Sequence, residues 1–249
     1  MLTRLDHLVV LVRDLELASA DYESLGFAVT PGGEHADGLT SNALMPFEDG
    51  SYFELVSFLD PDNPKDNVWG WRGFLPHEGL VDYCAASDDL DSDVSRLESL
   101  GFVVDGPDDG GRRLPDGEEI RWRIARIRQE GRLLPFLIED LTPRELRVPG
   151  GPAARHPNGA TSVSWLEVSA PDVRQAASSL SALAGIKNDT DSSVRLGACV
   201  LSPVSIEMGD AKGPGPSAVE LVGEEPGVSR ELDPVLAHGA GIRLRLSAG

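Results

Sequence analysis

Two polar residues inside apolar segments, His7 and Glu54, could hold a metal ion. His7 interrupts the apolar residues 5–10, and Glu54 lies within the apolar residues 52–56. A polar ring or a carboxylate among apolar neighbours is costly unless it is paired or bound to a cation. Imidazole and carboxylate groups are ligands that suit Zn, Fe, Mn or Ni. A structural alternative stays open, in which His7 is a core histidine and Glu54 pairs with an arginine such as Arg123.

Two further carboxylates, Asp82 and Glu139, complete the set of candidates. Asp82 follows His7 by 75 positions and also lies in an apolar segment. We predict that it is the third metal ligand, beside His7 and Glu54. Glu139 ends another apolar segment, and we predict that it is a catalytic carboxylate that moves a proton. The alternatives are an exposed strand position for Asp82 and the start of a loop for Glu139. A slip of one residue would turn the Glu139 side chain to the opposite face of its sheet.

An internal repeat predicts the elements that position these residues. An apolar segment, an Asp-Leu pair, an amphipathic helix and a Leu-Gly-Phe tripeptide occur in residues 5–27 and again in residues 80–102, at a constant offset of 75. Each Asp is a predicted helix N-cap and each Gly a predicted helix stop. A third copy begins at Ser162, and its helix ends at Gly185.

Short alternating segments between Gly, Asp and Pro turns follow each helix and predict strands. They are residues 28–30, 41–46 and 52–58 in the first copy, 103–104, 120–127 and 133–138 in the second, and 193–201, 205–208 and 218–222 in the third. Each copy is therefore a βαβββ module. Such a module leaves one sheet face unburied, so two modules must pair.

The predicted fold class is α+β, with tandem βαβββ modules paired into a half-open barrel. The paired modules take up residues 1–147, and a partial third module with a C-terminal strand takes up residues 148–249. The boundary follows from the Pro/Gly-rich residues 149–152. We expect the alternating residues 241–246 to supply the missing edge of the third module.

The repeated units resemble the glyoxalase-like domain of the vicinal oxygen chelate (glyoxalase/bleomycin resistance/dioxygenase) superfamily. The resemblance is carried by residues 5–10, by residues 42–46 with 50–55, and by residues 155–160. It implies paired modules that cup a divalent cation, with His7 and Glu54 as ligands. Asp82 departs from the pattern, since a second His commonly stands there. Some members of the superfamily bind small molecules without a metal.

The third copy repeats part of this pattern. Glu220 matches Glu54, but Trp165 stands at the position of His7, so a second metal site is not expected. We interpret Glu220 as structurally paired, and His156 with Asn158 as part of a turn.

Composition excludes several partner classes. The 249 residues include 22 basic and 41 acidic side chains, which gives a net charge of −19. A surface this acidic repels nucleic acid and anionic membranes, so neither is an expected partner. No apolar run approaches the roughly 20 residues that cross a bilayer, and we expect a cytoplasmic protein. Cys84 and Cys199 lack metal-site spacing and are expected to be small buried residues.

These observations predict a metal-assisted enzyme of the lyase, isomerase or dioxygenase type, acting on a small oxygen-rich substrate. A divalent ion (Zn, Fe, Mn or Ni) that chelates two neighbouring substrate oxygens would stabilise the charge that develops on them. The alternative is a metal-free protein of the bleomycin-resistance type that binds or sequesters a small molecule. A third hypothesis is a structural role, in which modules pair across a homodimer.

Overall fold

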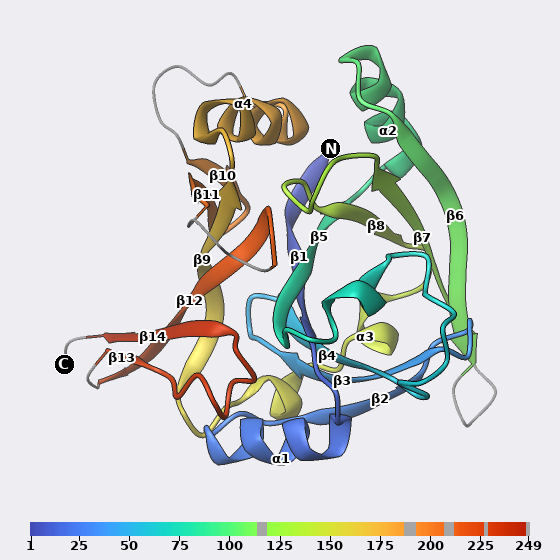
Figure 1. Ribbon diagram of the computed structural model, residues 1–249. Coiled ribbons are helices and arrows are strands. Elements are labelled where there is room, and N and C mark those ends of the chain that lie inside the picture. The colour runs from blue at the N-terminus through green and yellow to red at the C-terminus, as the bar shows by residue number, and fades with distance from the viewer. Residues whose placement is uncertain (114–118, 187–192, 207–211, 227–228, 248–249) are drawn as a thin grey trace. The chain divides into compact units, whose positions relative to one another are not determined.

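The computed structural model describes residues 1–113, 119–186, 193–206, 212–226 and 229–247 (Figure 1). The chain forms two compact units that are interleaved along the sequence. Unit 1 contains Met1–Asp6, Asp82–Arg147 and Trp165–Pro216, and unit 2 contains His7–Val81, Val148–Ser164 and Ser217–Gly249. The predicted domain boundary at residues 147/148 divides the chain in a different way and stays a prediction.

The first βαβββ module lies in unit 2, apart from the start of its first strand. Its elements are β1 (Leu2–Leu11), α1 (Leu15–Ser24), β2 (Thr30–Glu34), β3 (Thr40–Pro46) and β4 (Tyr52–Phe58). Hydrogen-bonded strands follow the order β2-β3-β4-β1, with β4 parallel to β1. Asp14 is the N-cap of α1, as predicted, and its side chain accepts a hydrogen bond from the Leu17 amide. The strand pairing makes β1 and β4 direct neighbours in the sheet.

The second module lies in unit 1 from Asp82 onward. Its elements are β5 (Gly79–Ser87), α2 (Leu90–Ser99), β6 (Val104–Arg113), β7 (Glu119–Ile127) and β8 (Phe136–Asp140), followed by the short helix α3 (Arg144–Arg147). The strand order is β5-β8-β7-β6. Asp89 caps α2, which confirms the offset of 75 between the two copies.

The strands β2 and β6 extend well beyond the residues that the sequence predicts for them. Residues 103–104 and 28–30 are predicted strands, whereas β6 reaches Arg113 and β2 reaches Glu34. Both extensions are rich in Gly, Pro or charged residues, which have low strand propensity. Pairing with β7 and with β3 holds them extended, because cross-strand partners outweigh intrinsic preference.

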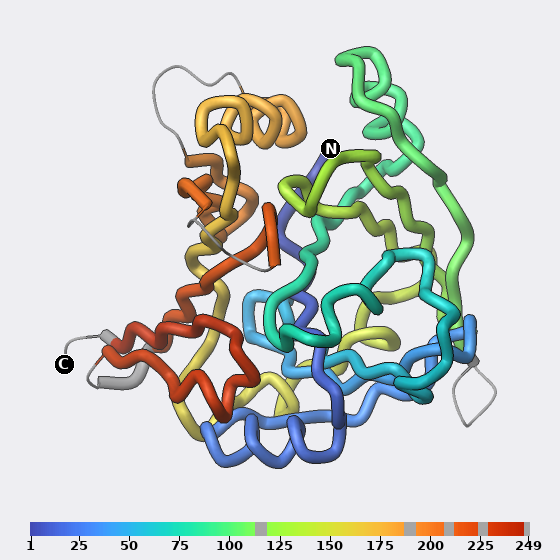
Figure 2. Tube along the Cα trace, in the orientation of Figure 1, coloured from blue at the N-terminus to red at the C-terminus, as the bar shows by residue number. Residues whose placement is uncertain are grey.

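The rest of the chain contributes a strand group to each unit. Unit 1 has β9 (Ala160–Ala170) from Trp165 onward, α4 (Val173–Ala184), β10 (Val194–Leu196) and β11 (Cys199–Ser205), with strands in the order β10-β11-β9. Unit 2 has β12 (Gly215–Pro226) from Ser217 onward, β13 (Arg230–Glu231) and β14 (Gly241–Ser247), in the order β12-β14-β13. Short 3-10 helices span Trp71–Phe74 and Gly151–Ala154. Figure 2 follows the backbone through these segments.

The strand β12 is longer than the predicted strand 218–222, and this region differs from its predicted strands in three further ways. The single predicted strand 193–201 is the hairpin of β10 and β11, since Gly197 turns the chain at φ +63°. The predicted strand 205–208 extends into residues outside the described part of the chain. The predicted strand 241–246 is present as β14, but β13 pairs with its outer side, so β14 is not an edge.

Each unit has its own apolar core. Tyr22 of α1 and Phe53 of β4 are fully buried in unit 2, and Leu97 of α2 and Leu137 of β8 are fully buried in unit 1. The fold class is therefore α+β with tandem βαβββ modules, as predicted. None of the helices in the described residues is long and apolar enough to cross a membrane.

Candidate functional site

His7 and Glu54 come together on one face of the first module. They lie on the parallel neighbours β1 and β4, where His7 is opposite Tyr52 and Val9 is opposite Glu54. Aligned residues of neighbouring strands point to the same face, as do residues two apart. His7 Nε2 lies 3.5 Å from Glu54 Oε2, and both residues are buried. The His7 ring stacks on Tyr52 with 4.6 Å between centroids, which orients the imidazole.

Two further residues of the same module surround the Glu54 carboxylate. Asn42 Nδ2 donates a hydrogen bond to Glu54 Oε1 at 2.5 Å, and His35 Nε2 lies 3.2 Å from the same oxygen. Thr40 Oγ1 is 2.6 Å from His35 Nδ1. Neither His35 nor Asn42 is predicted from the sequence. Asn42 lies two residues from Leu44, which pairs with Glu54, so the pairing of the predicted strands 41–46 and 52–58 could have identified it.

Gly32 on β2 leaves room for the Asn42 side chain. A Cβ at Gly32 would lie 2.0 Å from Asn42 Oδ1. Because the amide nitrogen faces the carboxylate, the amide oxygen must face Gly32. Asn42 Oδ1 is buried and has no hydrogen-bond partner in the described structure. A glycine at position 32 is therefore required for the Asn42 side chain to adopt this position.

The surroundings of Glu54 keep its carboxylate ionised. Burial alone would raise its pKa, but the hydrogen bond from His35, the positive charges of His7 and His35, and the Asn42 amide hold the pKa at about 2. Hydrogen bonds and opposite charges favour the ionised form. Glu54 is therefore an anion throughout the physiological pH range.

The donor set at this face fits a divalent metal ion. A neutral imidazole and an ionised carboxylate are the usual N and O ligands of Zn and Fe(II). Two ligand atoms about 2.1 Å from one ion, at tetrahedral or octahedral angles, lie about 3.0–3.4 Å apart. The 3.5 Å between His7 Nε2 and Glu54 Oε2 is close to that spacing.

Asp82 is engaged by an arginine of its own unit. It is buried on β5, and its Oδ2 accepts a hydrogen bond from Arg132 Nη1 at 2.7 Å. Its Oδ1 accepts one from the Tyr83 amide at 2.9 Å. The carboxylate charge is thus compensated inside unit 1. Its predicted role as a metal ligand stays a prediction.

Glu139 on β8 is also bound to an arginine. Its Oε2 accepts hydrogen bonds from Arg123 Nε at 2.9 Å and from Arg123 Nη2 at 2.5 Å. Arg123 also bonds Asp91 of α2 at 2.9 Å. The arginine named as an alternative partner of Glu54 therefore pairs with Glu139 instead.

The strand register shows which residue of the second module corresponds to Glu54. Val9 lies opposite Glu54, and Cys84, 75 positions after Val9, lies opposite Phe136. The counterpart of Glu54 is therefore Phe136, three residues before Glu139 and on the other face of β8. Asp82 and Glu139 are offset by five residues along the β5/β8 pair, or about 16 Å. The structure does not bring these two carboxylates together.

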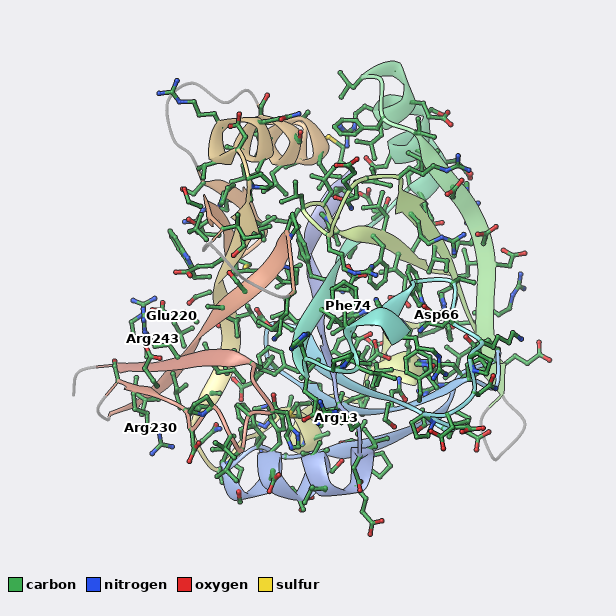
Figure 3. All side chains as sticks on the ribbon, in the orientation of Figure 1. Arg13, Asp66, Phe74, Glu220, Arg230 and Arg243 are labelled. Atoms are coloured by element: carbon green, nitrogen blue, oxygen red, sulfur yellow. The ribbon has the colours of Figure 1, made fainter. Side chains whose placement is uncertain are left out.

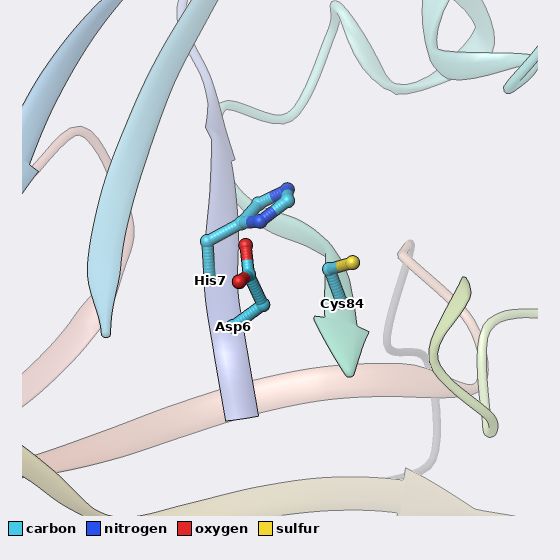
Figure 4. Close-up of side chains that lie close together, drawn as sticks. All are labelled: Asp6, His7 and Cys84. Atoms are coloured by element: carbon cyan, nitrogen blue, oxygen red, sulfur yellow. The ribbon is translucent and has the colours of Figure 1, made fainter. Parts of the chain in front are cut away.

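Asp6 and Cys84 have side chains of metal-ligand type, and Figure 4 shows them with His7. Asp6 accepts hydrogen bonds from Arg144 and from Arg147, the latter at 3.2 Å. Arg147 Nε also donates to Asp140 at 2.6 Å. Burial, with a further contribution from Asp6, raises the pKa of the Cys84 thiol well above its usual range. The charge of Asp6 is thus compensated by two arginines of its own unit.

His156 and Glu220 have structural partners, as the sequence suggests. His156 Nδ1 accepts a hydrogen bond from the Ala28 amide, and His156 Nε2 donates one to the Pro46 carbonyl, both at 2.9 Å. Burial lowers the pKa of His156 despite the Pro46 bond, so its imidazole is held neutral. Glu220 on β12 (Figure 3) accepts a hydrogen bond from Arg245 Nε at 2.9 Å.

Comparisons with known proteins agree with this architecture. The family model of the glyoxalase-like domain matches residues 5–184. A hypothetical protein from Staphylococcus aureus is 15% identical, with a TM-score of 0.75 over 98% of this chain and 99% of that one. A mutant 4-hydroxymandelate synthase from Streptomyces coelicolor is 14% identical, with a TM-score of 0.59 over 90% of this chain and 72% of that one. At these identities the two likenesses establish the fold alone. No curated protein matches the chain.

Proposed function

Since the chain belongs to the family of glyoxalase-like domains, we propose that it is a metal-assisted enzyme acting on a small oxygen-rich substrate. The reaction would be of the lyase, isomerase or dioxygenase type, with Zn, Fe, Mn or Ni as the divalent ion. The observation that carries this proposal is the pairing of His7 with Glu54 on one buried face of β1 and β4.

His7 and Glu54 would hold the ion, and the ion would supply Lewis-acid stabilisation of charge on substrate oxygens. Neighbouring side chains of the same module orient both residues. Stacking on Tyr52 orients His7, and Asn42 fixes the Glu54 carboxylate. The predicted proton-moving residue, Glu139, is bonded to Arg123. It would have to leave that partner to accept a proton from a substrate.

A metal-free binding protein is the second candidate function. Arg132 compensates the charge of Asp82, the residue at the position where the resemblance leads us to expect a second histidine ligand. A protein that binds a small molecule without an ion would not need Asp82 as a ligand, so Asp82 could remain paired with Arg132. A small-molecule ligand and a cytoplasmic location belong to both proposals, and light scattering would decide between a monomer and a homodimer.

Metal analysis of the purified protein separates the two functions. We expect about one equivalent of a divalent ion, and a rise in Tm when Zn, Fe(II), Mn or Ni is added to stripped protein. His7→Ala should abolish both, whereas His77→Ala, at an exposed histidine of the same unit, should leave both unchanged. Stabilisation by organic ligands alone, with no bound ion and no effect of His7→Ala, would favour the metal-free binder.

A further inference from the structure

We infer that Arg4, near the start of β1, is the main donor of a binding site for a small oxyanion, the carboxylate or phosphate group of a small molecule. The site belongs to a cluster of charged side chains in unit 1, which contains Arg4, Asp6, Asp140, Arg144 and Arg147. None of these residues is a proposed metal ligand. The inference therefore goes beyond the proposed function and does not depend on it.

The two carboxylates of this cluster already have partners. Asp6 is fully buried, and its oxygens accept hydrogen bonds from Arg144 and Arg147. Asp140 accepts hydrogen bonds from the same two arginines, at 3.3 Å from Arg144 Nη1 and 2.6 Å from Arg147 Nε. Two guanidinium groups thus balance two carboxylates. Arg4 adds a third positive charge that the aspartates of the cluster do not neutralise.

The Arg4 guanidinium has few partners of its own. Its Nη2 lies 3.8 Å from Asp6 Oδ2, which is too far for a hydrogen bond. Its Nε is buried and has no hydrogen-bond partner in the described part of the chain. Burial and the positive charge of Arg144 lower the pKa of Arg4. Because a buried donor without an acceptor and a nearby like charge both cost free energy, an added anion would be stabilising here.

Arg4 is also accessible and held in place. Its side chain is 35% exposed, whereas that of Asp6 is 0% exposed. Since Arg4 Nε is buried, the Nη groups are the donors that a ligand can reach. The turn between β10 and β11 covers the base of the side chain, where a Cβ at Gly197 would lie 2.8 Å from Arg4 Cβ. A side chain that is already ordered loses less entropy when it binds.

The chemistry of Arg4 selects the class of ligand. A guanidinium presents its N–H groups as a planar fork that matches two oxygens of a carboxylate or phosphate. The chain as a whole has a net charge of −19 and repels anions, so binding must come from contacts within the cluster. A chloride ion offers only one acceptor atom. We therefore expect oxyanions to bind here more tightly than chloride.

The test is isothermal titration calorimetry of the full-length chain with sodium phosphate and with sodium acetate, at constant ionic strength set by sodium chloride. The wild-type chain should bind at least one of these anions saturably, and the tighter one identifies the group as phosphate or carboxylate. Arg4→Met should weaken binding by roughly 10-fold or more, because charge-assisted hydrogen bonds are lost. Arg128→Met removes an exposed arginine that pairs with Asp105 and should bind like the wild-type chain.

Thermal unfolding gives a second readout and shows whether the variant folds. In sodium chloride alone, Arg4→Met should be at least as stable as the wild-type chain, because it removes the third positive charge and keeps an apolar side chain. The anion that binds should raise the Tm of the wild-type chain more than that of Arg4→Met. General stabilisation by phosphate acts on both chains equally.

The inference is wrong if the wild-type chain binds neither anion, if Arg4→Met binds as tightly as the wild-type chain, or if the anion raises both Tm values equally. No metal ion takes part in these measurements. Failure of this inference therefore leaves the proposed metal-assisted function as it stands, and metal analysis tests that function separately.

Discussion

Replacing Glu54 with Gln should lower the free energy of unfolding, and the loss should be larger at pH 5.5 than at pH 3. The pKa of Glu54 falls from 4.5 to about 2 on folding. A carboxyl group with a lowered pKa contributes stability above its unfolded pKa, and this contribution is lost as the pH falls toward the folded value. A difference of about 2.5 pKa units corresponds to about 3 kcal/mol. At pH 3 the unfolded carboxyl is almost fully protonated while the folded one is still ionised, so about 2 kcal/mol is already lost.

Urea unfolding in EDTA, at pH 5.5 and at pH 3, measures this effect. The difference in unfolding free energy between wild type and Glu54→Gln should shrink by about 2 kcal/mol between the two pH values. Glu34→Gln changes an exposed carboxylate nearby and should show no such change. A wild-type to Glu54→Gln difference that is equal at both pH values would refute the electrostatic account of this site.

Three further substitutions test the structural assignments by urea or thermal unfolding. Arg147→Met removes a buried partner of Asp6 and should cost about 3 kcal/mol; adding Asp6→Asn should restore part of that loss. Gly26→Ala should cost about 1–2 kcal/mol, because Gly26 has φ +85° and its new Cβ would lie 2.9 Å from Asn158 Cβ. His156→Ala leaves two backbone groups without their partner and should cost about 2 kcal/mol. The folded wild type, whose His156 pKa is lowered, should lose stability as the pH falls below 6.5, and His156→Ala should lose less. Equal pH profiles would contradict a neutral, buried His156.

The repeat predicts the positions of helices and first strands because their signals are local. An Asp that caps a helix and a Gly that ends it act within one turn, and both copies obey the offset of 75. The pairing of His7 with Glu54 can also be predicted from the sequence. Once β1 and β4 are known to be neighbours, the alternation of side chains along a strand determines which sheet face each residue points to.

The rest depends on long-range register and on loops. The apolar residues before Glu139 do not reveal that β8 aligns Phe136 with Cys84, because that alignment depends on the β7–β8 connection. His35 lies outside every strand, where no periodicity applies. Its place beside Glu54 follows from the β2–β3 pairing, and β2 itself is rich in Gly and Pro.

The buried carboxylates differ in the chemistry of their neighbours, and this difference supports the proposal of an ion in the first module. Four carboxylates are buried among the described residues: Asp6, Glu54, Asp82 and Asp93. Arg147, Arg132 and Arg96 contact the three aspartates, and a guanidinium has no lone pair to give a metal. Glu54 is instead contacted by two imidazoles and an amide. An imidazole can exchange its bond to a carboxylate for a bond to a shared cation, which is why we propose Glu54 together with His7 as the ligand pair.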